Sequence, residues 1–539
     1  MRRKLYLETF GCQMNVLDSE LVLGQLRAHG YEQVDDRAHA DVVIYNTCSV
    51  REHAEQKVWS RLGELRSEKK TKPHLVIGVI GCMAEREGPG IFKKYPHIDI
   101  LCGPAELDKL PGLVHNAVVT KGFRGQGSGF SEPDPDEKGT GVCFSDNVRG
   151  SGFSDAGVSD LHGESRMPNP KGRQVALMGV ATRRSSTLAA ATDTLELLDL
   201  SRSVSPTDDV AQAYVRITRG CNKHCSYCVV PYTRGPEVHR PPRNIIDEVK
   251  MLVDAGAREV TLLGQTVNHY HYRPDSGSDT TFADLMYMVH EAVPDLPRLR
   301  FVTSFPRDFT DAALEAMRDC PRICRYLHVP AQSASDRILK MMNRGYTSQQ
   351  YYDFIARAKA LMPDISLASD FIVGFPTETE EDHQKTLELI RHCRFKNSFI
   401  FKYSPRPGTT AIDRFGDDVP EDVKRRRNNE MLAVQQQVSQ EGNRALIGRT
   451  VEVLVEGESK LVSRQSKTAS SFVELTLSSR PRQHDDAPRM TQMVGRTRGD
   501  QVVCFDADDS LRGEILEVQI TDARNLTLFG RLANAMVPT

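Results

Sequence analysis

The sequence feature that most constrains this chain is a group of three cysteines within eight residues. Cys221, Cys225 and Cys228 are spaced as C-x3-C-x2-C. Thiolates are soft ligands that suit zinc ions and iron–sulfur clusters, and three of them on one loop can face a single centre. A four-iron cluster held by three cysteines keeps one iron open for a ligand that reacts. The spacing therefore predicts a catalytic cluster site.

A structural zinc site is the alternative. Such sites normally have four protein ligands and often use C-x2-C pairs that lie far apart in the sequence. No second pair of that kind is present, so zinc would need His224 or a distant residue as its fourth ligand. The triplet resembles that of the radical S-adenosylmethionine (SAM) enzymes, in which the open iron binds the amino and carboxylate groups of SAM.

Length and charge limit the class of protein. A chain of 539 residues holds about three domains. The net charge of −2 argues against a basic nucleic-acid coat, so RNA contacts must come from local patches. We find no apolar run of membrane-spanning length and no signal or mitochondrial leader near Met1, and the 12 cysteines suit a reducing compartment. A cytoplasmic protein without membrane contact is expected.

The first domain is expected over residues 1–120 as an open, parallel α/β sheet. Apolar strand-like runs alternate there with helix-like runs, which is the pattern of βαβ units. We expect strands at 4–10, 40–46, 74–80 and 98–101, and helices at 18–29 and 51–69. Cys102 also follows a strand-like run, but we give it no ligand role.

Three cysteines of this domain, Cys12, Cys48 and Cys82, each follow one of these strands. The carboxyl ends of parallel strands share one sheet edge, where ligands bind, so we expect the three thiols to converge on a second cluster site. Gly11 and Gly81 precede two of them and permit close backbone approach to a bulky cluster. Each cysteine taken alone is equally well explained as a small buried hydrophobic residue.

Residues 121–210 are expected to form a low-complexity, disordered insertion. Gly, Ser, Asp and Pro are frequent in its first part, 122–173, and such a segment cannot bury enough apolar surface to offset the entropy cost of ordering. Cys143 is expected to be a free thiol there. Residues 174–181 have the composition of a strand that returns to the fold.

The second folded domain is expected over residues 211–442 as a partial (βα)6 barrel. Its six strand-like runs are 214–218, 259–263, 299–303, 326–329, 366–373 and 398–403. Active sites of such barrels lie at the carboxyl ends of the strands. The polar residues at or just beyond these ends are predicted to bind SAM, with loop capping as their alternative role: Gln265, Asn268, Ser304, Gln332 and Asp370. The cysteines in or beside the helices are expected to pack in the core: Cys320, Cys324 and Cys393.

The last domain is expected over residues 443–534 as a small β-barrel. A helix at 421–442, which carries the basic run 424–427, precedes β-like runs at 450–456, 502–505, 513–521 and 526–531. Between Arg444 and Arg498 there are ten Lys or Arg against six Asp or Glu, which suits contact with an RNA backbone. A solvated surface without a partner is the alternative. Residues 466–490 are expected to be a loop insertion.

Six sequence motifs together resemble the MiaB-type tRNA methylthiotransferases. They are Tyr6–Asn15 (YLETFGCQMN), Asn46–Glu52 (NTCSVRE), Gly81–Arg86 (GCMAER), Gly220–Gly235 (GCNKHCSYCVVPYTRG), Val260–Gln265 (VTLLGQ) and Ser369–Phe375 (SDFIVGF). The resemblance covers nearly the whole chain except about 122–210 and 466–490. It departs at Ala334, where Gly is usual, and at Thr266, where Asn is usual.

The resemblance implies a radical SAM enzyme, a sulfur-group transferase with two 4Fe–4S clusters and a C-terminal RNA-binding TRAM domain. The Cys221, Cys225 and Cys228 cluster would cleave SAM to a 5′-deoxyadenosyl radical, which abstracts hydrogen from an aromatic carbon. The cluster of the N-terminal domain would deliver a methylthio group. The acceptor in this family is carbon 2 of N6-isopentenyladenosine next to the tRNA anticodon (position 37). Such a base must leave the anticodon stem-loop to be reached. An electron donor such as a flavodoxin or ferredoxin is implied as well.

Two other functions remain open from the sequence. A sister methylthiotransferase that modifies threonylcarbamoyladenosine in tRNA, or a ribosomal protein, would have the same two clusters. The contexts of Cys12 and of Arg234 favour the isopentenyladenosine class. A non-catalytic, zinc-dependent RNA-binding protein would also explain cysteines beside a basic barrel, and iron and sulfide analysis after anaerobic purification would separate it from the enzyme.

Overall fold

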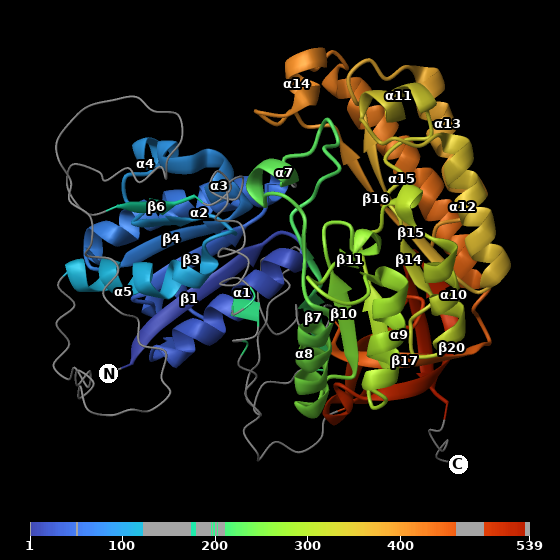
Figure 1. Cartoon of the computed structure of the whole chain (residues 1–539), viewed down its shortest axis with the longest axis horizontal. Helices are drawn as coiled ribbons and strands as arrows, with labels where there is room; N and C mark the ends of the chain where they lie inside the picture. Colours follow the sequence, from blue (N-terminus) through green and yellow to red (C-terminus); the bar gives the residue numbers. More distant parts are fainter. Residues whose placement is uncertain are drawn as a thin grey trace.

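The computed structural model describes residues 2–49, 52–121, 174–178, 196, 198–199, 202, 211–459 and 490–533. An N-terminal α/β domain lies beside a central set of strands and helices, and a small C-terminal barrel lies below that central part (Figure 1). No helix within the described ranges is long and apolar enough to cross a membrane. The α/β class and the three-part architecture expected from the sequence are confirmed.

The N-terminal domain is built on a six-stranded, all-parallel sheet of order β2-β1-β3-β4-β5-β6. Its strands are β1 (Arg3–Phe10), β2 (Tyr31–Gln33), β3 (Val42–Thr47), β4 (Val76–Gly81), β5 (Ile100–Cys102) and β6 (Val175–Leu177). Strands β3 and β4 are buried along their whole length, as expected when helices cover both faces of a parallel sheet.

Helices cover both faces of this sheet. One core contains side chains of α1 (Gln13–Ala28) and α5 (Leu110–Thr120), and the other contains side chains of α2 (Glu52–Thr71), α3 (Cys82–Glu87) and α4 (Ile91–Lys94). The predicted strands and helices of this domain are present within a few residues. The sequence analysis missed β2, a three-residue edge strand too short to show alternation.

Part of the range 121–210 belongs to the fold. The strand expected within 174–181 is confirmed as β6, which extends the sheet beyond β5. Glu196, Leu198, Asp199 and Arg202 contact the folded domains, with Leu198 in the core of the N-terminal domain. The remainder of this range except Lys121, including Cys143, lies outside the described residues, and the same holds for 460–489.

The central domain has six parallel strands in sequence order: β7 (Gln212–Arg216), β10 (Glu259–Leu263), β13 (Arg298–Phe301), β14 (Tyr326–His328), β15 (Ser366–Val373) and β16 (Asn397–Lys402). They form two three-stranded ladders, β13-β10-β7 and β14-β15-β16. A single bridge between Leu299 and Ile323 joins the ladders, with a hydrogen bond from Ser304 N to His328 O of 3.1 Å. The predicted partial barrel is therefore present, with a seam between β13 and β14.

Amphipathic helices surround these strands. They are α8 (Pro242–Asp254), α9 (Phe282–Ala292), α10 (Asp311–Asp319), α11 (Asp336–Met341), α12 (Ser348–Leu361), α13 (Glu380–Cys393), α14 (Thr410–Phe415) and α15 (Glu421–Arg444). Capping boxes at Thr281, Thr347 and Thr379 fix the starts of α9, α12 and α13, because each threonine and its acidic or amide partner satisfy free backbone N–H groups.

The C-terminal domain is a closed barrel of order β17-β18-β19-β21-β20. Its strands are β17 (Thr450–Glu458), β18 (Met490–Thr497), β19 (Val502–Asp508), β20 (Ile515–Arg524) and β21 (Thr527–Leu532). Four of these were expected from the sequence. Strand β18 was missed, since Gly495 and Arg496 interrupt its apolar pattern.

This small barrel docks on the amino ends of the central strands, away from the cysteine loop (Figure 1). Arg298, at the start of β13, is fully buried and pairs with Glu452 of β17 at 2.8 Å. Lys396, which precedes β16, pairs with Asp500 in the turn between β18 and β19. Ion pairs therefore close the lower end of the central barrel.

We predict that this docking depends on the buried Arg298 and not on charge in general. Arg298→Met should lower the free energy of unfolding by about 3 kcal/mol, because it removes the cation that pairs with Glu452 and leaves the buried Glu259, 3.9 Å away, with one cation fewer. The matched control is Arg258→Met, whose pair with Glu514 at 3.7 Å also joins the two domains but is about half exposed; it should cost below about 1 kcal/mol. Urea denaturation followed by circular dichroism measures both. Equal, small losses would contradict the prediction.

Candidate functional site

The structure brings Cys12, Cys48 and Cys82 to one edge of the N-terminal sheet. Strands β1, β3 and β4 end in register, with Phe10 opposite Thr47 and Thr47 opposite Gly81. Cys48 follows β3 directly and its N–H donates to Phe10 O at 3.0 Å, while Cys82 begins α3 and Cys12 precedes α1. The convergence expected from strand topology is therefore present.

Hydrogen bonds of two buried asparagine side chains, Asn15 and Asn46, hold this edge of the sheet in place. The Cys12 thiol donates to Asn15 Oδ1 at 3.2 Å, and Asn15 Nδ2 donates to Asn46 Oδ1 at 3.0 Å. Asn46 Nδ2 in turn donates to Asn15 O at 2.8 Å. Gly11 is required here because a Cβ atom on it would lie 2.6 Å from Cys48 Cβ, with φ at +151°. The chain thus packs tightly around the thiols.

The pKa values at this edge depend on the neighbouring thiol and on one arginine. The hydrogen bond with Cys48 lowers the pKa of Cys12 to about 6, against the effect of burial. Burial raises the pKa of Cys82, and Arg234 acts in the opposite direction. A positive charge beside two buried thiols favours their thiolate forms, which are the forms that bind metal.

The second triplet lies on the loop after β8 (Thr218–Arg219), at the carboxyl end of the central strands. Cys221 N donates to Gly235 O at 3.1 Å and Cys228 N donates to Cys225 O at 3.0 Å, so the loop folds back on itself. Gly220 has φ at +70°, and a Cβ atom there would lie 2.0 Å from Pro236 O, so only glycine fits. All three cysteines are partly exposed.

Arg344 is the positively charged residue that contacts this second triplet. Its Nη1 donates to Cys225 Sγ at 3.4 Å and its Nη2 donates to Pro330 O at 2.7 Å. The guanidinium carbon lies 4.4 Å from the centre of the Phe305 ring, a cation–π contact that holds it in place. Burial raises the pKa of Cys228. The Cys228 thiol therefore loses its proton only when a metal centre binds it, because the positive charge of the metal stabilises the thiolate.

The sulfur atoms of neither triplet all lie within 4.8 Å of one another. Among the described residues, the one group of His, Cys, Asp and Glu whose ligand atoms all lie within that distance is Glu380, His383 and Glu430. An arginine lies beside each cysteine triplet, Arg234 beside one and Arg344 beside the other. What each triplet binds stays a prediction.

Arg234 connects the two triplets. It lies just after the cysteine loop, between α7 (Val230–Thr233) and Gly235, whose carbonyl accepts from Cys221 N. Its guanidinium reaches into the N-terminal domain, where it pairs with the fully buried Asp18 of α1 at 2.8 Å. It also acts on the thiols of Cys12 and Cys82. The two cysteine sites therefore lie on either side of one buried arginine.

A larger set of buried charges extends this connection. Arg216 pairs with Asp18 at 2.8 Å and with Asp199 at 2.7 Å, and Asp199 also pairs with Arg219 and Arg240. Burial raises the pKa of Asp199, but the three arginines outweigh burial and hold this pKa well below its usual range. Asp199 therefore stays charged and holds Arg216, which joins the two domains through its pair with Asp18 of α1.

A second contact joins the domains at the far edge of the central barrel. Arg406, in the loop after β16, donates to Glu55 Oε2 of α2 at 3.2 Å, and Arg86 of α3 holds the same carboxylate at 2.6 Å. Arg234 lies near the first strand of the barrel and Arg406 after the last. The sheet edge with Cys12, Cys48 and Cys82 is therefore attached to the barrel on both sides.

The five residues predicted to bind SAM have different environments. The Asn268 amide joins two loops, donating to Phe305 O at 2.9 Å and accepting from Phe305 N at 2.7 Å. The Ser304 hydroxyl is buried without a hydrogen-bond partner. Gln332, whose φ is +69°, forms two backbone hydrogen bonds with β15: its N–H donates to Asp370 O, and its carbonyl accepts from Ile372 N. Gln265 lies after β10 and is partly exposed. Their contact with SAM stays a prediction.

Asp370 differs from its predicted position. It was expected at or just beyond a strand end, but it lies inside β15, three residues before that strand ends. Its Oδ1 lies 2.9 Å from His328 Nε2 of the adjacent β14. The predicted bounds of this strand, 366–373, match β15, so the error was to count Asp370 as an end residue although the predicted strand already enclosed it.

Four other cysteines are ordinary core residues. Cys102, Cys320, Cys324 and Cys393 are all at most 2% exposed, and Cys102 donates to Glu106 O at 3.2 Å. This confirms the packing role expected for Cys320, Cys324 and Cys393.

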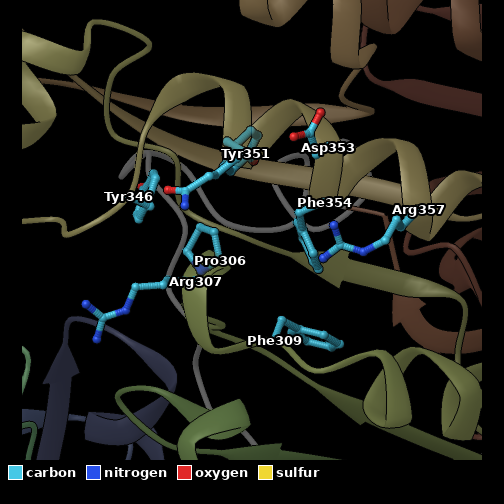
Figure 2. A pocket seen from close by; sticks show the side chains of 9 residues that line it. Pro306, Arg307, Phe309, Tyr346, Tyr351, Asp353, Phe354 and Arg357 are labelled. Carbon is cyan, nitrogen blue, oxygen red and sulfur yellow. The ribbon is translucent and has the colours of Figure 1, made fainter.

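A pocket of about 220 Å³ lies outside both cysteine sites, between the turn after β13 and α12 (Figure 2). Figure 2 shows Arg307 and Arg357 at its two sides, with Pro306 and Phe354 between them. Each arginine has a carboxylate partner, Asp308 and Asp311 respectively. None of the residues predicted to bind a cluster or SAM lines this pocket.

Sequence reasoning missed the residues that support the cysteines. Asn15, Asn46 and Arg234 lie inside the motifs that carry the family resemblance, but no role was assigned to them. Asp18 interrupts the apolar face of a helix, which is a signal for a buried carboxylate. Arg344 lies far from the cysteine loop in sequence and carries no local signal.

Three family models match the chain. Residues 4–103 match a model described as Uncharacterized protein family UPF0004, residues 215–390 match the Radical SAM superfamily, and residues 485–533 match the TRAM domain. The matched ranges correspond to the parallel sheet, the partial barrel and the closed C-terminal barrel. The radical SAM match supports an iron–sulfur cluster and SAM as cofactors.

Curated relatives are similar over nearly the whole length. A tRNA-2-methylthio-N(6)-dimethylallyladenosine synthase from Rhodopirellula baltica is 41% identical over 538 residues, covering 100% of this chain and 97% of the relative. Relatives with the same description from Bacteroides fragilis and Acetivibrio thermocellus are 37% and 38% identical, each over 98% of this chain and over 95% and 91% of their own lengths.

Solved structures resemble the chain more distantly. The radical SAM methyltransferase TsrM from Kitasatospora setae is 13% identical, with a TM-score of 0.47 over 76% of this chain and 77% of that one, and this likeness carries no argument. The relatives decide the family. With three matching domains and 41% identity over its full length, the chain belongs to the MiaB-type family of tRNA-2-methylthio-N(6)-dimethylallyladenosine synthases, which are radical SAM enzymes.

Proposed function

We propose that this protein transfers a methylthio group to carbon 2 of N6-isopentenyladenosine next to the tRNA anticodon. The observation that carries this proposal is the pair of three-cysteine sites on adjoining domains, on either side of Arg234. One reactive site would suffice for SAM cleavage alone. A second one, attached to the barrel at both edges, is what sulfur transfer to the same substrate requires.

The cysteines would hold two 4Fe–4S clusters. When bound at Cys221, Cys225 and Cys228, one cluster supplies the electron that cleaves SAM to methionine and a 5′-deoxyadenosyl radical. Cys12, Cys48 and Cys82 would hold the second cluster, which supplies the sulfur. Both assignments are supported by the three cysteines gathered at each site and by the arginine beside each of them, Arg344 and Arg234.

The protein's own residues orient and shield these groups. Arg344 donates to Cys225 Sγ and is held over the Phe305 ring, so it stabilises negative charge on that thiolate. Arg234 does the same beside Cys12 and Cys82. The docked C-terminal barrel closes the lower end of the central barrel, which keeps water away from a radical.

The substrate and partners follow from the family. The relatives are named for dimethylallyladenosine in tRNA, which is the same modified base as isopentenyladenosine. The TRAM domain would contact the tRNA backbone through its exposed basic residues. An electron donor such as a flavodoxin or ferredoxin is needed, and the cytoplasm is the compartment we propose. The sister reactions on other substrates and the zinc-binding module are not favoured.

Cys225→Ala should abolish reductive cleavage of SAM, because two thiolates do not hold the cluster whose open iron binds it. The N-terminal cluster should remain, with about half of the iron and sulfide. Production of 5′-deoxyadenosine by the anaerobically reconstituted protein is the measurement. The matched control is Cys320→Ala, a buried core cysteine that should keep the activity. Normal 5′-deoxyadenosine production by Cys225→Ala would refute the assignment.

Cys48→Ala should separate the two activities. Sulfur insertion into tRNA should be lost, while cleavage of SAM continues, because the cysteine loop of the barrel is untouched. Nucleoside analysis of tRNA and the assay for 5′-deoxyadenosine measure the two outcomes side by side.

The control for this variant is Cys102→Ala, which alters a buried cysteine at the end of the next strand, β5, in the same sheet. It should retain both activities. If Cys48→Ala still produces methylthiolated tRNA at the normal rate, the N-terminal cysteines are structural.

A further inference from the structure

Strand alternation identifies the inner wall of the central barrel. Side chains of a β-strand point alternately to the two faces of the sheet. On β15, Leu367, Phe371 and Val373 pack in the core with the outer helices. The alternate residues Asp370 and Ile372 therefore face the inside of the barrel.

Two phenylalanines on β16 face the same way. In the parallel pairing of β15 and β16, Phe399 lies opposite Asp370 and Phe401 lies opposite Ile372. Ile400, between them, packs against the core with the outer helices. Ser398, which precedes Phe399, points the same way as Ile400, since its hydroxyl lies 2.7 Å from Gln435 Oε1 of α15. Both rings thus belong to the inner wall, on the last strand of the sheet β14-β15-β16.

These two rings are unusually exposed for their position. Phe399 is 44% exposed and Phe401 is 38% exposed, although both lie on the concave side of a folded domain. Rings two residues apart on one strand are about 7 Å apart. An open apolar surface of this kind inside a barrel indicates a ligand-binding wall.

The Phe399 ring is held in a fixed orientation. It makes an edge contact with the His328 ring, with ring centres 6.1 Å apart and an angle of 89°. His328 is fixed in turn by its contact with Asp370 Oδ1 at 2.9 Å. A fixed aromatic face offers a stacking surface for a planar base without an ordering cost.

The wall lies close to the reactive cysteine loop. Asp370 O accepts from Gln332 N at 2.8 Å, and Pro330 O, two residues before Gln332, accepts from Arg344. Arg344 is also the residue that donates to Cys225 Sγ. A base on the wall would therefore lie beneath the loop on which SAM is cleaved.

We propose that Phe399 and Phe401 bind the isopentenyl-bearing adenine of the tRNA and select it over unmodified adenosine. The proposal rests on the function proposed above and adds the residues that recognise the substrate. The five-carbon chain, which unmodified adenosine lacks, would lie across both rings, and each buried methylene raises affinity about fourfold. The adenine itself would be splayed out of the RNA loop, as bases recognised in such loops are.

Binding of RNA measures this without using catalysis. Two synthetic anticodon stem-loops are compared, one with isopentenyladenosine and one with adenosine at the same position, by Kd for the cluster-loaded protein without SAM. Phe399→Ala and Phe401→Ala should each reduce the preference for the modified RNA by about tenfold, which is about 1.4 kcal/mol. Affinity for the unmodified RNA should change much less.

Two controls isolate the cause. Leu432→Ala removes an equally exposed apolar side chain (45% exposed) on α15, a helix outside the barrel, and should leave the preference unchanged. Phe399→Leu keeps the apolar surface but removes the aromatic face, so it should retain more of the preference than Phe399→Ala. Circular dichroism and iron content confirm that each variant is folded.

Three outcomes would overturn the proposal. One is an unchanged preference in both alanine variants, and another is an equal loss of affinity for both RNAs. The third is a loss of SAM binding with the RNA preference intact, which would make the wall a site for the adenine of SAM. Failure of the proposed function is separate, since it would appear as a wild-type protein that makes no methylthiolated tRNA.

Discussion

The buried charges around Asp18 and Asp199 are the interaction on which the arrangement of this protein depends. Two carboxylates at most 1% exposed hold Arg216, Arg219, Arg234 and Arg240. Burying a charge without a partner costs several kcal/mol. The N-terminal sheet and the central barrel therefore fit together only in the arrangement that pairs these charges. That one arrangement is what places the two cysteine triplets on either side of Arg234.

Much of the fold and the cysteine sites could be predicted because their signals are local. Strands that end directly before Cys48 and Cys82, and the spacing from Cys221 to Cys228, are visible in short windows of sequence. Arg344 and Asp199 could not be predicted in this way, because their roles depend on partners far away in the chain. The exposure of Phe399 also has no sequence signal, since an apolar residue in a strand is normally expected to be buried.

Several basic residues counted from the sequence have acidic partners within the fold. In the run 424–427, Lys424 pairs with Asp417, Arg426 with Glu380 and Arg427 with Glu378. Arg496 and Arg498 add to the basic excess of the C-terminal domain, yet both contact the docking region. A net charge says nothing about which residues already have partners within the fold.

The docked C-terminal barrel has a consequence for the stability of the central barrel. Tyr326, at the base of the central barrel, is almost fully buried between Arg300 and Lys396, whose charges lie 5.4 Å and 5.1 Å from its ring centre. Lys396 and the nearby Arg298 have their acidic partners, Asp500 and Glu452, on the C-terminal barrel. Loss of contact with that barrel would leave buried cations at the base of the central barrel without these partners, so the fold of the central barrel depends on its neighbour.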